Sequence, residues 1–215
     1  TEPTGTVTFD VSSADTGEAT VDLAQLTFGV FNWFTPQTVT ITGANDDVDD
    51  GNQDTTVTVA VDAGSTDDTI YDAIAAQAVT ATTVDDDTVG YTLSTTTASV
   101  TEGGSTDTFT VVLDTEPTGT VALDVSSADT GEATVSPSTL TFTTANWSTP
   151  QTVTVTGVGE DVADGDQDTT VTVAVDAGST ADTLYDAIAA QTVTATTVDD
   201  DTVGFTLSGT SITVT

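Results

Sequence analysis

The chain contains no lysine, arginine, histidine, cysteine or methionine among its 215 residues. Without cysteine, disulfides, thiolate zinc sites and cysteine nucleophiles are excluded. Only carboxylates remain as side-chain bases, so we do not expect an enzyme. The chain offers no trypsin-type cleavage site and lacks the side chains most easily oxidised, which suits a protein outside a cell. Adaptation to a salty habitat explains the same composition equally well.

The second feature of the composition is its unbalanced negative charge. The chain carries 35 acidic residues and a formal net charge of −35. Phosphate backbones and anionic lipid headgroups repel such a polyanion, so neither nucleic-acid binding nor membrane-surface binding is expected. No segment approaches the ~18 consecutive apolar residues of a membrane span, and membrane insertion is not expected either. The counterions must come from outside the chain.

The pattern of apolar residues indicates a folded, all-β protein. Hydrophobic residues make up 36% of the chain, and valine alternates with threonine over many short stretches. Alternation with a period of two is typical of strands that have one apolar and one polar face. Charge of this density usually indicates disorder, but these alternating stretches contain enough apolar side chains to form a core.

A long internal repeat organises the sequence. TEPTGTV begins at Thr1 and again at Thr115, and with this period of 114 residues roughly three quarters of the aligned positions are identical. A repeat of this length corresponds to a whole β-sandwich domain of ~100 residues. We therefore predict tandem seven-stranded antiparallel β-sandwich (Ig-like) domains: residues 1–88 a partial repeat lacking its first strands, 89–202 a complete repeat, and 203–215 the first strand of a following repeat.

Strands and core positions in the complete repeat follow from the same alternation. We predict strands at 90–101 (broken at 94–97), 106–114, 118–126, 138–143, 150–157, 168–177 and 191–198. The predicted core consists of Phe109, Val111, Leu113, Val121, Leu123, Leu140, Phe142, Val153, Val155, Val171, Val173, Val193 and Ala195. Residues 184–191 are expected to form one helical turn whose Tyr185 or Ile188 closes an end of the sandwich.

Acidic residues gather in loops of each repeat. The complete repeat has Glu102, then Glu160 with Asp161, Asp164, Asp166 and Asp168, and then Asp199, Asp200 and Asp201; the partial repeat has Asp46, Asp47, Asp49, Asp50 and Asp54, then Asp85, Asp86 and Asp87. The start of the first strand, the loop after the fifth and the end of the last can meet at one end of a sandwich. Carboxylates brought together there repel one another, and Ca²⁺ satisfies them with six to eight oxygen ligands. The alternative is that the loops are simply solvated.

The order of several motifs resembles the Calx-beta domain, which also occurs in repeated form in very large bacterial surface proteins. The motifs are VTEGG, TFTVVLD, LTFTTANWSTPQTVTVTGV, an acidic loop containing DG, and QTVTATTVDDD. The resemblance implies that calcium is bound by Glu102, Glu160, Asp161, Asp164, Asp199, Asp200 and Asp201, with Asp129 as a further ligand. In the partial repeat the same implication falls on Asp15 and the loop from Asp46 to Asp54, although this repeat has no residue matching Glu102.

Two further features concern the surface. Val30, Phe31 and Phe34 flank Trp33 at loop positions that hold Thr144, Ala145 and Ser148 in the second repeat. They either form a contact patch or cover the end of the sandwich together with Trp33. Asn146 begins an Asn-Trp-Ser triplet, which is an acceptor sequence for glycosylation.

These observations favour a calcium-stiffened spacer in a secreted or cell-surface, adhesin-like protein, whose partners are the neighbouring repeats. Two alternatives remain open. The chain is a filament subunit whose tail, GFTLSGTSITVT, completes the strand-deficient first domain of an identical chain. Or it is an adhesive module that binds a ligand. The ragged ends are also explained if the chain is an interior piece of a longer array.

Overall fold

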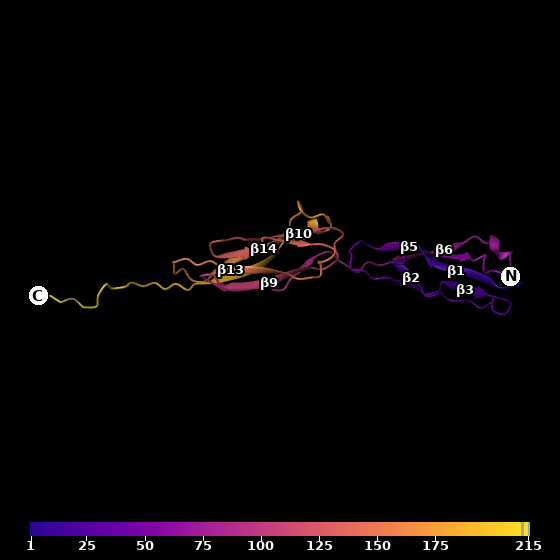
Figure 1. Ribbon diagram of the computed structural model, residues 1–215, viewed down its shortest axis with the longest axis horizontal. Helices are drawn as coiled ribbons and strands as arrows, with labels where there is room; N and C mark the ends of the chain where they lie inside the picture. Colours follow the sequence, from indigo (N-terminus) through magenta and orange to yellow (C-terminus); the bar gives the residue numbers. More distant parts are fainter. Residues whose placement is uncertain (212, 215) are drawn as a thin grey trace. The chain divides into compact units, whose positions relative to one another are not determined.

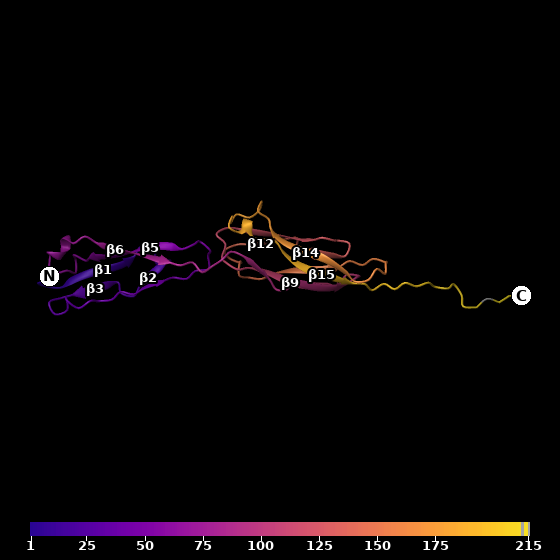
Figure 2. The ribbon, with the colours of Figure 1, turned by 180° about the vertical axis from the view of Figure 1, so that it is seen from behind.

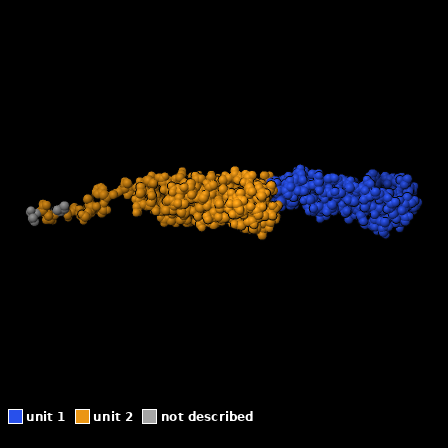
Figure 3. Space-filling model, turned by 90° about the horizontal axis from the view of Figure 1, so that it is seen from above, with its two compact units in different colours: residues 1–87 blue, residues 88–215 orange. Residues whose placement is uncertain are grey.

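The protein is described here from a computed structural model, which places residues 1–211, 213 and 214. The chain divides into two compact units, Thr1–Asp87 (unit 1) and Thr88–Thr215 (unit 2), which are coloured separately in Figure 3. No helix within the described part of the chain is long and apolar enough to cross a membrane. The predicted all-β class is confirmed, because nearly all regular structure in both units is strand.

Unit 2 is a sandwich of two sheets, seen from opposite sides in Figures 1 and 2. The five-stranded sheet has the order β12-β10-β14-β15-β8, and the four-stranded sheet has the order β11-β13-β9-β7. The strands are β7 (Tyr91–Leu93), β8 (Thr97–Thr101), β9 (Thr106–Leu113), β10 (Val121–Ser127), β11 (Ala133–Ser136), β12 (Thr139–Phe142), β13 (Gln151–Gly157), β14 (Gln167–Val175) and β15 (Gln191–Val198).

The pairing of β8 with β15 brings the start of the unit to its end. These strands run parallel, with Thr97 opposite Thr194 and Thr101 opposite Val198, whereas the other described pairs of strands are antiparallel. Parallel strands finish at the same edge of a sheet. The residues that follow β8 and β15 are therefore neighbours, although about 100 residues separate them in the sequence.

The core of unit 2 lies where the sequence pattern places it. All thirteen predicted core residues are buried, and each is no more than 2% exposed. The buried cluster also contains residues that were not predicted: Tyr91 of β7, Ala98 and Val100 of β8, Val125 of β10 and Ala133 of β11. Tyr185 lies in the short 3-10 helix η2 (Tyr185–Ala187), is fully buried, and is the side chain that closes the end of the sandwich; Ile188 packs against the core but is only partly buried. The alternating threonines mostly face outward.

The expected seven strands become nine in the described residues of unit 2. Two of the nine, β7 and β8, correspond to the single broken strand predicted at 90–101. The strand that sequence reasoning missed is β11, which pairs with β13 through Ala133 opposite Gly157. Its four residues provide one fully buried alanine and end just before Pro137, so they carry too short an alternation to stand out from a loop.

Unit 1 repeats the last six strands of this sandwich. It contains β1 (Val7–Ser13), β2 (Ala19–Val21), β3 (Gln25–Phe28), β4 (Ile41–Gly43), β5 (Gln53–Val61), η1 (Tyr71–Ala73) and β6 (Gln77–Thr83), which match β10 to β15 and η2 at the offset of 114. Its sheets are β3-β1-β5-β6 and β2-β4. The described residues of unit 1 contain no counterpart of β7, β8 or β9. Its buried cluster is correspondingly small and consists of Val11, Leu26 and Val57, with partly buried neighbours.

Candidate metal centre

Asp199 organises the end of unit 2 at which β8 and β15 finish. Its Oδ1 accepts a hydrogen bond from the backbone N–H of Asp201 at 2.8 Å, and its Oδ2 accepts one from Gly165 at 2.7 Å. Gly165 has φ +84°, a left-handed conformation that glycine adopts without strain. The bonds fasten the acidic loop between β13 and β14 to the closing aspartates, so two of the three predicted acidic groups are held together.

Glu102 brings the third acidic group to the same place. It directly follows β8, and its backbone N–H donates to the carbonyl of Val198 at 3.1 Å. The start of the first strand was predicted to lie here, but the end of β8 lies here instead, because β8 runs parallel to β15. The Glu102 side chain is only 5% exposed.

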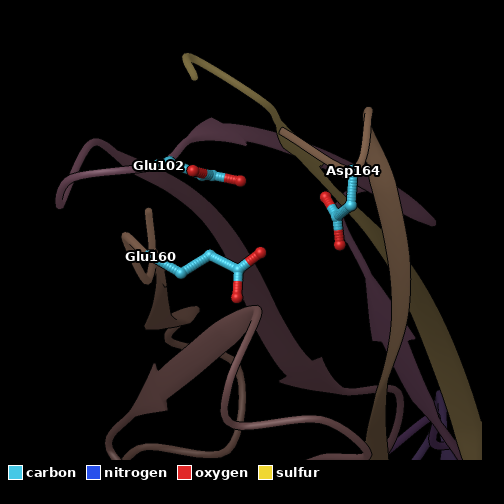
Figure 4. Close-up of side chains that lie close together, drawn as sticks. All are labelled: Glu102, Glu160 and Asp164. Atoms are coloured by element: carbon cyan, nitrogen blue, oxygen red, sulfur yellow. The ribbon is translucent and has the colours of Figure 1, made fainter. Parts of the chain in front are cut away.

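Five carboxylates meet at this point in two overlapping groups. One oxygen from each of Glu102, Glu160 and Asp164 lies within 4.8 Å of the other two, and the same holds for Glu102, Asp199 and Asp201. Figure 4 shows the side chains of Glu102, Glu160 and Asp164 directed toward a common space. Ligands of one Ca²⁺ ion lie at roughly 2.3–2.6 Å from it, so two of them can be up to about 5 Å apart. The spacing suits a shared ion.

Two glycines allow the loop after β13 to approach the residues around Glu102. A β-carbon on Gly159 would lie 2.8 Å from the backbone nitrogen of Gly103. A β-carbon on Gly157 would overlap the carbonyl oxygen of Thr101. The absence of side chains at 157 and 159 therefore sets the distance between Glu160 and Glu102.

The surroundings of these carboxyl groups disfavour their negatively charged forms. Burial raises the pKa of Glu102 above its ordinary value, and the nearby carboxylates of Asp199 and Asp201 raise it further. Burial also raises the pKa values of Glu160 and Asp201; for Glu160 the strongest charge is that of Asp164, and for Asp201 it is that of Asp161. Like charges held together in a partly dry site favour the neutral form or a bound cation.

Two carboxylate oxygens in the cluster lack a hydrogen-bond partner. Oε2 of Glu102 and Oδ2 of Asp201 are buried and accept no hydrogen bond from the described residues. A buried acceptor of this kind is costly unless it is satisfied. No lysine, arginine or histidine exists in the chain to do so. The donor set, hard oxygens only, therefore fits Ca²⁺, which Glu102, Glu160, Asp164, Asp199 and Asp201 would hold.

The remaining predicted ligands of unit 2 lie around this cluster. Asp161 acts on the pKa of Asp201, and Asp200 acts on the pKa of both Glu102 and Asp201, so both are near. Asp129 instead lies in the turn before β11, where its Oδ1 accepts from the N–H of Gly131 at 2.8 Å. It is not among the described carboxylates that come within 4.8 Å of one another.

Two other acidic residues of the loop have structural partners. Oδ1 of Asp166 accepts from the N–H of Asp199 at 3.2 Å, and Oδ1 of Asp168 accepts from the hydroxyl of Thr196 at 2.6 Å. They support the cluster from outside.

Sequence reasoning missed Glu132. This residue stands just before β11, and its charge raises the pKa of Glu160, second among the neighbouring charges after Asp164. Its backbone carbonyl accepts hydrogen bonds from Val158 and Thr197, which fixes it beside the loop. The motif GEATV occurs in both repeats, at 17–21 and 131–135, and could have pointed to this residue. Because strand β11 was not predicted, the place of Glu132 beside the acidic loop could not be inferred.

Unit 1 repeats the scaffold of the site. Oδ1 of Asp85 accepts from Asp87 at 2.9 Å and its Oδ2 from Gly51 at 2.6 Å, with Gly51 at φ +76°. A cavity of about 20 Å³ lies among the acidic residues. Its acidic lining consists of Glu18, Asp46, Asp50, Asp85, Asp86 and Asp87.

Charges in unit 1 act on one another as they do in unit 2. Burial raises the pKa of Glu18, the counterpart of Glu132, and the charges of Asp50, Asp46 and Asp15 add to it. Burial likewise raises the pKa of Asp87, with contributions from Asp86, Asp85, Asp47 and Asp46. Among the described residues of unit 1, however, no three carboxylates come within 4.8 Å of one another. This unit has no counterpart of Glu102.

The aromatic loop of unit 1 is exposed. Phe31 is 90% exposed and Phe34 67%, while the ring of Trp33 lies edge-on to that of Phe34 at 5.9 Å. One of the two predictions was that Phe31 covers the end of the sandwich, and the exposure of its side chain does not agree with that. Val30 is 36% exposed beside it.

Asn146 has a local structural role. Its side-chain oxygen accepts from the backbone N–H of Thr143 at 2.6 Å, and its side-chain nitrogen donates to the carbonyl of Thr141 at 3.3 Å. Asn32 makes the equivalent bonds with Gly29 and Thr27 in unit 1, where no acceptor triplet exists. The turn alone explains why asparagine stands at this position.

Comparison with known proteins returned solved structures only. No family model matches the chain, and no curated protein matches it. Domains 4 and 5 of the S-layer protein SbsC are similar at 18% identity and a TM-score of 0.43, over 88% of this chain and 70% of that one. The apo form of the Calx CBD1 domain is similar at 13% identity and 0.39, over 53% and 98%. CBD12 from CALX1.2 is similar at 12% identity and 0.40, over 92% and 89%.

Proposed function

We propose that this chain is a non-catalytic, calcium-stiffened structural repeat of a secreted or cell-surface protein of the adhesin type. The observation that carries the proposal is the pair of buried, unpartnered oxygens on Glu102 and Asp201 inside a cluster of five carboxylates. In a chain without basic side chains, only a proton or an external cation can balance them.

The position of the cluster explains what a bound ion would do. Glu102 follows β8, Glu160 and Asp164 lie between β13 and β14, and Asp199 and Asp201 follow β15. An ion held by Glu102, Glu160 and Asp164 would join the end of β8 to the loop that connects the two sheets, and one held by Glu102, Asp199 and Asp201 would join the ends of β8 and β15. Bound calcium would thereby stabilise the sandwich and restrict the segment that leaves it.

The composition supports an extracellular setting. Oxygen-only sites in extracellular modules bind calcium at about 10⁻⁴ to 10⁻³ M, a concentration that is sustained outside cells. A chain without lysine or arginine also offers no trypsin-type cleavage site. Near-identical repeats suit a spacer, since each added copy lengthens it.

The test is thermal unfolding of the whole chain, first in excess chelator and then across a calcium titration at fixed ionic strength. At free calcium about a hundredfold above Kd, mass action predicts roughly 2.7 kcal/mol of added stability. Magnesium, which demands a smaller octahedral site, is the matched control and is expected to give much less. A rise that magnesium or sodium reproduces would mean that the loops only attract diffuse counterions, and the proposal would be withdrawn.

A second candidate function is adhesion through the aromatic loop of unit 1. Phe31 and Phe34 are largely exposed, whereas the second repeat has Ala145 and Ser148 at these positions. Exposed aromatic clusters commonly mark contact surfaces. A Phe31→Ala, Phe34→Ser double variant restores the second repeat's residues. Loss of surface or ligand adhesion with unchanged unfolding would support this function, and unchanged adhesion would contradict it.

A further inference from the structure

Differences between the two repeats gather around one pocket of unit 1. The pocket has a volume of about 480 Å³, and its walls are residues 4–6, residues 29–32 and Asp67. Four of these eight residues differ from their counterparts at the offset of 114, whereas only 19 of the 87 residues of unit 1 do so. The four replacements are Gly29 for Thr143, Val30 for Thr144, Phe31 for Ala145 and Asp67 for Ala181. Unit 1 therefore presents a surface at this place that unit 2 lacks.

The same place is open to solvent in both units. Val30, Phe31 and Asp67 are exposed, and so are their three counterparts in unit 2. In unit 2 the strand β9 precedes this place and still leaves it open. The exposure is therefore a property of the repeat itself, and only the side chains differ between the two copies.

One wall of the pocket is fixed by backbone contacts. The backbone N–H of Asp67 donates to the carbonyl of Thr6 at 2.7 Å. A β-carbon on Gly5 would lie only 2.8 Å from the β-carbon of Asp67, so a residue with a side chain at position 5 would push Asp67 away. The glycine thus holds the aspartate close to residues 4–6.

The opposite wall is a closed turn that contains Phe31. The backbone N–H of Gly29 donates to Oδ1 of Asn32 at 2.6 Å, and the backbone N–H of Asn32 donates to the carbonyl of Gly29 at 3.1 Å. Gly29 also has no side chain where unit 2 has that of Thr143. A binding site whose backbone is ordered in advance loses less entropy when a ligand arrives.

An aromatic ring and a carboxylate that line one pocket suit a guanidinium group. The guanidinium of arginine is planar, so it stacks on an aromatic face and donates to a carboxylate in a fixed fork. Phe31 is 90% exposed and offers the ring, and Asp67 offers the carboxylate. The net charge of −35 attracts a cationic partner over a distance and repels an anionic one.

We propose that this pocket of unit 1 binds an arginine side chain of a basic partner protein, with the guanidinium against the ring of Phe31 and the carboxylate of Asp67. The inference rests on the adhesive function proposed above for the aromatic loop, and it names the chemistry of the ligand. The partner is a different protein, because this chain has no arginine or lysine with which to fill the pocket of another copy.

The test is an NMR titration of the whole chain with a short peptide that contains one arginine, at about 0.3 M salt to screen diffuse attraction to the acidic surface. We expect a saturable change in the amide signals of residues 29–32 and 67. The signals of residues 143–146 and 181 stay unchanged and serve as a control within the same molecule. A peptide with citrulline, which resembles arginine in shape but has no charge, is expected to move neither set. Signals that move in both units, or equally with citrulline, overturn the proposal.

Two variants give unit 1 the residues of the second repeat, one at a time. We expect Asp67→Ala to weaken binding of the arginine peptide roughly tenfold, because hydrogen bonds to a charged group are lost. Phe31→Ala removes a cation–π contact at an exposed site and is expected to cost about two- to fivefold. Asp72→Asn, which is exposed on η1 outside the pocket, is the matched control and keeps the affinity. Wild-type affinity in Asp67→Ala overturns the proposal.

The reverse exchange transfers the pocket to unit 2. It consists of Thr143→Gly, Thr144→Val, Ala145→Phe and Ala181→Asp. We expect the signals of this part of unit 2 to respond to the arginine peptide in the exchanged chain, and a silent unit 2 would contradict the assignment.

Adhesion assays separate this inference from the function on which it rests. Adhesion that is lost in the Phe31→Ala, Phe34→Ser variant but persists in Asp67→Ala leaves the adhesive function in place and overturns the cationic ligand. An uncharged saccharide that moves the signals of residues 29–32 and 67, when the arginine peptide does not, has the same consequence. Adhesion that is unchanged in all of these variants removes the adhesive function, and the ligand proposed here with it.

Discussion

The carbonyl oxygen of Thr101 occupies the space where a β-carbon on Gly157 would be. This close approach joins the end of β8 to the end of β13. Thr101 directly precedes Glu102, and Gly157 lies three residues before Glu160. The geometry of the carboxylate cluster therefore depends on a backbone contact that contains no charged group. A substitution outside the cluster can disturb it.

Gly157→Ala tests that dependence. We expect the variant to lose about 1–3 kcal/mol of stability, as overpacked sites commonly do, and to bind calcium more weakly because β13 moves away from Glu102. Gly43→Ala is the matched control, since a β-carbon there meets only the side chain of Thr83, at 3.3 Å or more. Calorimetric titration and chemical unfolding measure both effects. Equal behaviour of the two variants would show that the approach does not shape the site.

Glu102→Gln tests the role of the negative charge of Glu102, because glutamine has nearly the same size and shape but no charge. The variant removes the most enclosed carboxylate, so we expect calcium affinity to fall roughly tenfold or more, with little loss of stability in chelator because the buried charge is gone. Asp186→Asn, on the exposed surface of η2, is the control and should leave affinity unchanged. Isothermal titration of both variants decides the matter. Wild-type affinity in Glu102→Gln would exclude this residue as a ligand.

Asp107 should make unit 2 sensitive to acid. Hydrogen bonds from the backbone N–H groups of Ser99 (2.9 Å) and Thr108 (2.8 Å) hold the pKa of Asp107 below its ordinary value. A carboxyl group with a lowered pKa in the folded state contributes stability above its unfolded pKa, about 3.9, and this is lost as pH falls through the folded pKa.

Urea unfolding between pH 7 and pH 2 in chelator measures this contribution. We expect Asp107→Asn to be less stable than wild type at pH 7 and to show a shallower loss of stability below about pH 3.9. Parallel curves for the two proteins would mean that Asp107 contributes nothing to the acid response.

The two repeats provide a matched pair for core packing. Phe142 is fully buried in unit 2, whereas its counterpart Phe28 is only partly buried in unit 1. Phe142→Ala should cost about 3–5 kcal/mol and Phe28→Ala clearly less, because the cost follows the apolar contact that is lost. The two unfolding transitions of the chain, followed by calorimetry, give both values. A larger loss for Phe28→Ala would contradict this dependence on burial.

Tyr91 tests whether the first strand of a repeat needs its hydroxyl group. That hydroxyl donates to the carbonyl of Val173 at 2.7 Å and accepts from the N–H of Gln191 at 3.1 Å. Tyr91→Phe, which copies the residue at 205, should destabilise unit 2 by about 1–2 kcal/mol. Chemical unfolding measures the loss. An unchanged midpoint would mean that water replaces both bonds.

The sequence alone was sufficient for the class, the core and most of the strands. Alternating apolar residues with one buried face locate Val121, Leu123 and their like without knowledge of pairing partners. β11 was missed because Ala133 is the only fully buried residue among its four. Because β11 was not predicted, the location of Glu132, which directly precedes it, was not predicted either. Which carboxylates meet depends on strand order, and alternation carries no information about that.

The carboxylate cluster was likewise predictable only in part. Clustering in the sequence pointed to Glu102, Glu160 and the closing aspartates, and the fold brings the first two together with Asp199 and Asp201. The parallel pairing of β8 with β15 could not be predicted, because pairing direction depends on how the whole chain is wound. Asp129, assigned by resemblance alone, accepts a hydrogen bond from Gly131 within its own turn, and its role as a ligand stays a prediction.

The parallel ladder between β8 and β15 also determines how unit 2 would carry tension. A pull on the two ends of the unit draws Thr97 backward and Val198 forward along the same axis. All the hydrogen bonds of the ladder are then loaded together in shear, instead of opening one after another as they would in a hairpin pulled from its free ends. Glu102 and Asp199 directly follow these two strands. An ion bound between their carboxylates would therefore resist the sliding of β8 along β15.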